Sequence, residues 1–122
     1  GISGCFMKTA PLFVTSGLES VRVWNVKDAT APTQVGGLPN ALFGNEAMDC
    51  GERRTDDGKR RFALIGVDLY QASPSDPQHV NAGGNELVVV DVTDPAAPAI
   101  VGRAPAKTST HTVACVDEYD CR

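Results

Sequence analysis

The feature that most constrains this chain is an internal repeat with a spacing of 66 residues. The segment 87–102 reads LVVVDVTDPAAPAIVG, and the earlier segment 21–36 reads VRVWNVKDATAPTQVG. Over the twenty aligned pairs from Ser20/Glu86 to Pro39/Pro105, eight are identical. These pairs are Val23/Val89, Val26/Val92, Asp28/Asp94, Ala31/Ala97, Pro32/Pro98, Val35/Val101, Gly36/Gly102 and Pro39/Pro105. Repetition at this spacing predicts an array of similar units, each packed against its neighbours.

In both copies, an apolar strand is followed by a turn that begins with aspartate and contains proline. Asp28 and Pro32 mark the turn in the first copy, and Asp94, Pro95 and Pro98 mark it in the second. The aspartate side chain can accept a hydrogen bond from the backbone two residues ahead, and proline cannot continue a strand ladder. A repeated carboxylate could instead bind a cation. We expect these residues to be structural, because every unit needs the same turn.

The rest of the chain is predicted to form short strands with no amphipathic helix. No strand is predicted before residue 11, and Asp57-Gly58 predicts a hairpin. The expected strands span residues 11–15, 21–26, 34–38, 45–50, 61–69, 86–92 and 99–104. An insertion at 70–84 contains prolines and a glycine pair, which predicts a surface loop. Tyr70, Gln71, His79 and Asn81 of this loop are candidates for contact with a partner.

These patterns predict an all-β fold made of units of four antiparallel strands, arranged as blades of a β-propeller. Residues 1–44 form a first, partial blade, residues 45–110 form a second blade with the inserted loop, and residues 111–122 start a third. A closed propeller needs at least four blades. We therefore expect these residues to belong to a larger propeller; assembly with other chains and an open sandwich-like piece are the alternatives.

The segment 87–102 resembles the LVIVD repeat, a β-propeller repeat of mostly bacterial and archaeal secreted or cell-surface proteins. The segment 21–36 is a weaker match, with Asn25 where the repeat has Asp and Ala29 where it has Pro. Segments 44–48 and 110–115 also look like blade starts of such proteins. The resemblance implies a propeller fold and supplies no catalytic residue, because propellers have many unrelated activities.

The four cysteines of the chain, Cys5, Cys50, Cys115 and Cys121, include no C-x-x-C pair. This pattern favours disulfides in an oxidising compartment over a structural zinc site. The first three each precede the second strand of a unit, so we expect them at similar positions in their blades. Cys115 and Cys121 enclose five residues, which makes a local disulfide easy, and Cys5 with Cys50 would then link neighbouring units. Sequence alone allows three connectivities.

Charge and hydropathy exclude two classes of partner. The net charge is −4 and no extended basic patch occurs, so nucleic acid is not expected as a partner. No apolar run is long enough to span a bilayer. The cysteines place the protein in an extracellular, periplasmic or cell-surface location. The chain begins at Gly1 without a signal peptide, which a cleaved leader or a longer parent chain explains.

Two functions of different class remain open. The first is a non-catalytic binding or scaffold module, an accessory subunit of an extracytoplasmic assembly, whose partners are another protein or further blades, with oligomer formation possible and no cofactor expected. The second is a propeller enzyme, a metal-dependent oxidoreductase or lactonase-like hydrolase, with its site in the central channel. His111, Asn45 and Glu46 would line that channel, and His111 is the weak metal candidate. A hydrogen-bonded structural histidine is the favoured interpretation.

Overall fold

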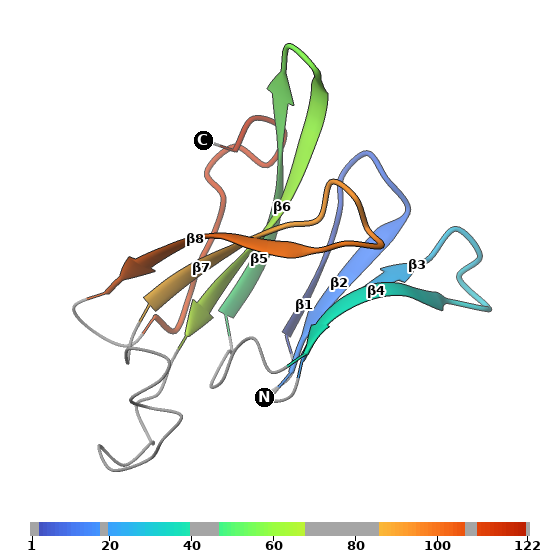
Figure 1. Cartoon of the computed structure of the whole chain (residues 1–122), viewed down its shortest axis with the longest axis horizontal. Coiled ribbons are helices and arrows are strands. Elements are labelled where there is room, and N and C mark those ends of the chain that lie inside the picture. The colour runs from blue at the N-terminus through green and yellow to red at the C-terminus, as the bar shows by residue number, and fades with distance from the viewer. Residues whose placement is uncertain (1–2, 18–19, 40–46, 68–85, 107–109, 122) are drawn as a thin grey trace.

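The computed structural model of the chain describes residues 3–17, 20–39, 47–67, 86–106 and 110–121. These residues form eight β-strands and no helix, in two four-stranded antiparallel sheets (Figure 1). The first sheet has the order β1-β2-β3-β4, with β1 Ser3–Phe6, β2 Leu12–Ser16, β3 Ser20–Asn25 and β4 Thr33–Pro39. The second has the order β5-β6-β7-β8, with β5 Ala47–Thr55, β6 Gly58–Val67, β7 Glu86–Asp91 and β8 Ala99–Pro105. The predicted all-β fold and the four strands per unit are confirmed.

The sequence repeat is also a repeat of strand register. The pairing of β3 with β4 shifts between Val23 and Trp24, and the pairing of β7 with β8 shifts between Val89 and Val90. These two irregularities lie 66 residues apart, at aligned positions of the repeat. A β-bulge at one fixed place bends a strand in the same way each time. The two sheets are therefore built on one plan.

The repeated aspartates close the turns between the last two strands of each sheet. Asp28 Oδ1 accepts hydrogen bonds from the Thr30 amide at 2.9 Å and from its hydroxyl at 2.7 Å. These bonds hold the pKa of the Asp28 carboxyl below its ordinary value. Asp94 Oδ1 accepts from the Ala96 amide at 3.0 Å. Both side chains therefore stabilise turns, as an aspartate at this position is expected to do.

A third turn of the same kind occurs at the C-terminal end of the described chain. Asp117 Oδ1 accepts hydrogen bonds from the amides of Tyr119 at 3.0 Å and Asp120 at 3.2 Å. The Asp120 amide also donates to the Asp117 carbonyl at 3.2 Å, as Ala31 does to Asp28 and Ala97 to Asp94. This turn was not predicted from the sequence, because the residues around Asp117 are Glu, Tyr and Cys rather than Ala and Pro. No strand is assigned within residues 110–121.

Three strands differ most from the prediction. β1 precedes residue 11, where no strand was predicted, and completes the first sheet by pairing with β2. β5 and β6 are longer than expected and meet in a two-residue turn at Asp56-Asp57, followed by Gly58 with φ of 129°. Glycine adopts this backbone conformation without strain. The loop 70–84, with its candidate residues Tyr70, Gln71, His79 and Asn81, lies outside the described residues.

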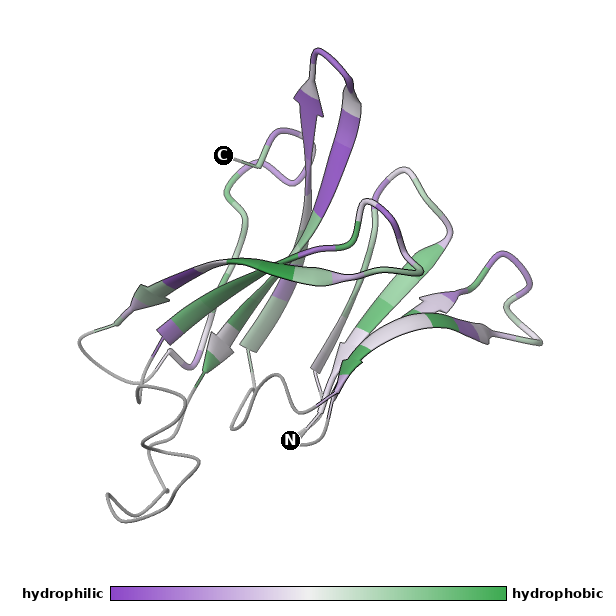
Figure 2. Cartoon of the chain, viewed as in Figure 1, coloured by the Kyte–Doolittle hydropathy of each residue, from purple (hydrophilic) through white to green (hydrophobic). Residues whose placement is uncertain are grey.

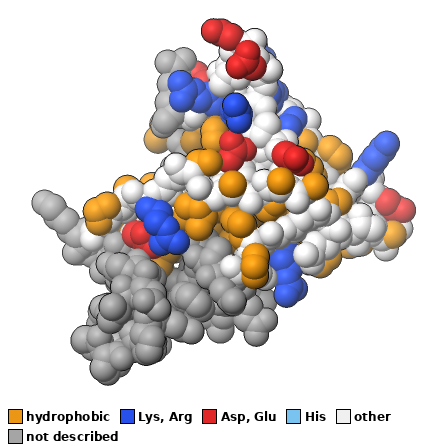
Figure 3. Space-filling model, in the orientation of Figure 1, with side chains coloured by type: hydrophobic (Ala, Val, Ile, Leu, Met, Phe, Trp, Pro, Cys, Tyr) orange, Lys and Arg blue, Asp and Glu red, His pale blue; other side chains and the backbone are white. Residues whose placement is uncertain are grey.

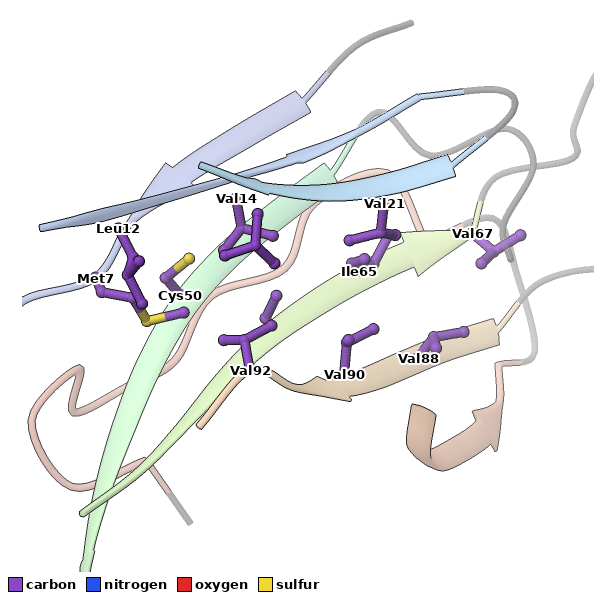
Figure 4. Close-up of a cluster of buried hydrophobic side chains, with 12 residues drawn as sticks. Met7, Leu12, Val14, Val21, Cys50, Ile65, Val67, Val88, Val90 and Val92 are labelled. Atoms are coloured by element: carbon purple, nitrogen blue, oxygen red, sulfur yellow. The ribbon is translucent and has the colours of Figure 1, made fainter. Parts of the chain in front are cut away.

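The core lies between the two sheets and is built mainly from valine (Figure 4). Strand side chains alternate between the two faces of a sheet, so every second residue reaches this layer. The body of the sheets is hydrophobic, whereas the tip of the β5–β6 hairpin is hydrophilic (Figure 2). The buried side chains of the core are Met7, Leu12, Val14, Val21 and Val23 from the first half, and Cys50, Ala63, Ile65, Val67, Val88, Val90 and Val92 from the second.

Gly36 in β4 allows the second sheet to approach the first. A Cβ atom at Gly36 would lie 2.0 Å from the carbonyl oxygen of Pro95, in the turn between β7 and β8. We predict that Gly36→Ala forces the turn away and lowers the free energy of unfolding by about 1–3 kcal/mol, as overpacking does. Urea denaturation measures this change.

Gly102 gives the matched control, because it is the repeat partner of Gly36 in β8. Among the described residues, the nearest atom to a Cβ at Gly102 is Val89 Cβ at 3.7 Å, an ordinary contact. Gly102→Ala should therefore leave the stability of the chain nearly unchanged. Equal losses in the two variants would contradict the close approach at Gly36.

Candidate functional site

The face that the first sheet turns toward the core is not the repeat equivalent of the face that the second sheet turns toward it, and we call two such faces unlike. One apolar face of the second sheet is therefore not covered by the first sheet. In β3, Val21 and Val23 point into the core and are fully buried. In β7 the buried residues are instead Val88 and Val90. The repeat partners of Val21 and Val23 are Leu87 and Val89, which lie on the opposite face and are only partly buried.

A groove opens over this second face. We call it the outer groove; its volume is about 530 Å³. Its apolar floor is formed by β6 and β7, and its rim is formed by the C-terminal segment. The lining residues are Phe62, Leu64, Leu87 and Val89 on the floor, and Arg53, Ala114, Cys115, Val116, Asp117, Asp120 and Cys121 at the rim. Val116 is fully exposed there, with a relative accessibility of 104%.

The C-terminal segment, residues 110–121, is held along the second sheet by backbone contacts. The Glu52 amide donates to the Glu118 carbonyl at 2.9 Å, and the Cys121 amide donates to the Glu52 carbonyl at 2.8 Å. Two glycines of the sheet allow this approach, since a Cβ at Gly51 would lie 2.6 Å from Cys121 Cβ and one at Gly66 would lie 2.4 Å from the Thr110 carbonyl oxygen. The segment therefore protects part of the free edge of β5.

The cysteines form two disulfides, Cys5–Cys50 and Cys115–Cys121, the pairing that the sequence analysis favoured. The strand register corrects one detail of that analysis. Cys5 is paired with Val14 in β2, whose repeat partner Leu64 pairs with Asp49 rather than with Cys50. Cys5 and Cys50 therefore lie on unlike faces of their sheets and meet across the core. At the next position, Asp49 Oδ2 accepts a hydrogen bond from the Cys115 amide at 2.7 Å.

Glu52 is a buried carboxylate at the junction of the two sheets. Its side chain is 0% exposed and accepts hydrogen bonds from the Thr9 amide at 2.8 Å and the Thr9 hydroxyl at 2.6 Å. The Lys59 ammonium lies 3.2 Å away and Arg61 Nε lies 3.8 Å away. Burial raises the pKa of this carboxyl, but the bonds from Thr9 and the charge of Lys59 outweigh it, so the pKa lies below its ordinary value. Glu52 thus joins the β1–β2 connection to the β5–β6 hairpin.

The β5–β6 hairpin extends beyond the rest of the second sheet as a charged arm (Figure 1). Two pairs of cations face each other across it, Arg53 with Arg60 and Arg54 with Lys59. Like charges at directly opposed positions destabilise a strand pair. Two of the four cations have carboxylate partners, since Lys59 lies beside Glu52 and Arg60 Nη1 lies 3.4 Å from Asp91 Oδ2. Figure 3 shows charged side chains at the tip and hydrophobic side chains over the sheets below.

An aromatic face lies on the first sheet, on the side away from the core. It consists of Phe6, Phe13 and Trp24, which are cross-strand neighbours on β1, β2 and β3. The rings of Phe6 and Phe13 have centroids 4.5 Å apart, and Trp24 Nε1 donates to the Thr15 hydroxyl at 3.1 Å. Phe6 is 61% exposed. Phe13 and Trp24 are only partly buried, so the three rings form an apolar surface on this side of the sheet.

The structure does not assemble the predicted metal candidate into a site. His111 is exposed, and its predicted companions Asn45 and Glu46 lie outside the described residues. Within residues 3–17, 20–39, 47–67, 86–106 and 110–121, no three His, Cys, Asp or Glu side chains form a group that could hold a metal ion. No helix in the described part of the chain is long and apolar enough to cross a membrane.

The outer groove, the buried Glu52 and the aromatic face were not predicted from the sequence. The signal for the groove was present, because Leu87-Val88-Val89-Val90 is apolar at four successive positions and so has two apolar faces. Comparison with protein-family models finds no match, and comparison with curated proteins finds none either. The resemblance to the LVIVD repeat therefore stays a prediction.

We predict that Glu52→Gln lowers the free energy of unfolding by about 1–3 kcal/mol at neutral pH, because charged hydrogen bonds at a buried group are lost. The pKa of Glu52 is lower in the folded chain than in the unfolded chain, so the charge stabilises the fold above the ordinary glutamate pKa. That stabilisation is lost as the pH falls through the lowered pKa. Urea denaturation from pH 7 to pH 3 should show the wild type approaching Glu52→Gln in acid.

Glu118→Gln is the control for this experiment. Glu118 forms an ion pair with Lys8 at 2.7 Å, but its side chain is 42% exposed. Exposed ion pairs contribute little to stability. A loss at Glu118 as large as that at Glu52 would show that burial is not the reason for the Glu52 effect.

Proposed function

We propose that this chain is a non-catalytic binding or scaffold module outside the cytoplasm, and that its two sheets are consecutive blades of a β-propeller. One observation carries the proposal: the packing of the sheets uses unlike faces. Contact between unlike faces leaves a free face at each end of the stack, so that the same contact can be repeated by further units. Repetition of this kind around an axis produces a propeller.

The residues that form the first interface support this interpretation. The floor of the outer groove consists of Phe62, Leu64, Leu87 and Val89. By strand register these correspond to Leu12, Val14, Val21 and Val23, which are buried against the second sheet. The second sheet therefore presents to its other side the same kind of surface that the first sheet presents to it. A surface of this kind suits a partner sheet better than a small polar substrate.

The two disulfides support a place in an oxidising compartment, which includes extracellular, periplasmic and cell-surface locations. Cys5–Cys50 links the two sheets directly, and a cross-link over 45 residues stabilises a chain by about 4 kcal/mol in the loop-entropy treatment. Cys115–Cys121 holds the C-terminal turn beside the outer groove. A scaffold outside the cell benefits from such cross-links because they restrict the unfolded chain.

A third unit appended to the chain tests the blade assignment. We predict that inserting a second copy of residues 45–110 after Thr110 raises the free energy of unfolding by on the order of 3 kcal/mol, because the outer groove becomes covered. The extended chain should unfold in one cooperative transition, as stacked repeats do. Separate unfolding of the added unit, with the original transition unchanged, would contradict the proposal.

The enzyme alternative requires a metal or another reactive group, and its metal-dependent form is testable directly. We predict that the protein purified from an oxidising host contains no stoichiometric copper, calcium or zinc by elemental analysis. His111→Ala should then leave the metal content and the unfolding transition unchanged. Stoichiometric metal that disappears in His111→Ala would favour the oxidoreductase over the scaffold.

A further inference from the structure

We propose that the charged arm, residues 53–60 at the end of the β5–β6 hairpin, binds an extended acidic segment of a partner protein along its β5 edge. The inference rests on the proposed binding role of the chain, and it names the chemistry of the partner. It does not depend on how many sheets are stacked. Further sheets would cover the faces of the present ones, whereas the arm extends past the sheets along the direction of its strands (Figure 1).

The arm is a two-stranded ribbon without support from the rest of the second sheet. β7 pairs with β6 only over residues 62–67, so residues 58–61 pair with β5 alone. The corresponding hairpin of the first sheet is shorter, since β1 has 4 residues and β2 has 5, against 9 in β5 and 10 in β6. A two-stranded ribbon has little stability of its own in water. The arm therefore adds nothing to the apolar core or to the strand pairing with β7.

The β5 edge of the arm offers backbone groups for pairing. Glu52 uses its outward amide and carbonyl for hydrogen bonds with the C-terminal segment, to the Glu118 carbonyl and from the Cys121 amide. Outward backbone groups recur at every second residue of an edge strand, so those of Arg54 also point away from β6. Among the described residues, no hydrogen bond reaches the Arg54 amide or carbonyl from this side. An extended segment can therefore pair with the edge at Arg54.

The side chains on this edge select an acidic partner. Arg53 and Arg54 point to opposite flanks of β5, and neither forms an ion pair with any described residue. Their cross-strand neighbours, Arg60 and Lys59, are also cations, so both flanks are positively charged. A guanidinium binds a carboxylate through two parallel hydrogen bonds. Two successive acidic residues of an added strand would point to opposite flanks, and each would meet one arginine.

The charge pattern favours a protein segment over a uniformly anionic polymer or surface. Asp56 and Asp57 form the exposed tip of the arm, where Figure 3 shows acidic side chains. A sulfated polysaccharide or an anionic membrane would meet these two carboxylates before it reached the cations behind them. Pairing between two copies along this edge is also disfavoured, because the arginines of one arm would face those of the other. A protein segment with two adjacent acidic residues avoids both kinds of repulsion.

Fluorescence anisotropy with a labelled peptide tests the proposal. The probe is Thr-Val-Glu-Glu-Val-Thr, capped at both ends, and its control has Gln-Gln in place of Glu-Glu. At low ionic strength the 122-residue chain should bind the probe at least about tenfold more tightly than the control, because two exposed ion pairs are formed. Arg53→Gln/Arg54→Gln should weaken binding of the probe by a similar factor. Arg22→Gln/Lys27→Gln removes two exposed cations from the first half of the chain and should leave binding unchanged.

Arg54→Pro separates strand pairing from charge attraction. Proline at this position removes an amide that points away from β6, so the ladder between β5 and β6 is preserved. Arg54→Gln removes the same charge and keeps the amide. Because a backbone hydrogen bond to the partner is lost, Arg54→Pro should bind the probe about fivefold more weakly than Arg54→Gln. Urea denaturation should show that all the variants fold.

Each contrary result removes a defined part of the proposal. Equal binding by Arg54→Pro and Arg54→Gln would overturn the strand pairing, and equal binding of the probe and its control would overturn the selection of an acidic partner. A wild type that binds neither peptide overturns the proposal as a whole. A heparin oligosaccharide that binds the arm in place of the peptide would assign the arm to a polysaccharide and also overturn it. None of these results affects the experiment with the added third unit, which decides the stacking of blades separately.

Discussion

Burial of valine side chains between two sheets is the interaction on which the rest of this structure depends. In the described part of the chain, neither sheet has a second layer of its own, so without the other sheet the valine face of each would be exposed to water. Each sheet stabilises the other through side chains that alternate along β2, β3, β6 and β7. The disulfide Cys5–Cys50 and the buried Glu52 then fix the two sheets at the edge where β1 approaches β5.

The unlike faces used in this packing connect the fold to the proposed function. A contact between equivalent faces would bury both of them, and no further unit could be added through the same contact. The observed contact leaves the aromatic face on one side and the outer groove on the other. The C-terminal segment already lies along the groove and ends in a third aspartate turn, which closes with the same backbone bond as the turns at Asp28 and Asp94.

Much of the fold could be predicted from the sequence, because its signals are local. The aspartate turns, the strand positions in 21–36 and 87–102 and the Asp57-Gly58 hairpin depend on neighbouring residues. β1 could not be predicted in this way, because Ser3-Gly4-Cys5-Phe6 has no alternating pattern and forms a strand by pairing with β2. The partners of Glu52 were also out of reach, since Thr9 lies 43 residues away in the chain.

The sequence repeat does not show which face of each sheet is covered by the other sheet. Val23 and Val89 are identical and aligned, yet Val23 is fully buried and Val89 forms the floor of a groove. Sequence alignment gives equivalent residues equivalent places in a sheet, but it does not say which face of the sheet is covered. That depends on the order of the sheets in the stack. The same limit explains why the cysteines were expected at similar positions, whereas Cys5 and Cys50 lie on unlike faces.

Disulfide mapping of the oxidised chain tests the stacking of unlike faces most directly. Trypsin separates Cys5 from Cys50 and leaves Cys115 and Cys121 in one peptide, because no Lys or Arg lies between those two. Our account predicts a cross-linked pair of peptides that contain Cys5 and Cys50, and a separate peptide with an internal disulfide. A link from Cys115 or Cys121 to either of the other two cysteines would contradict the arrangement of the two sheets described above.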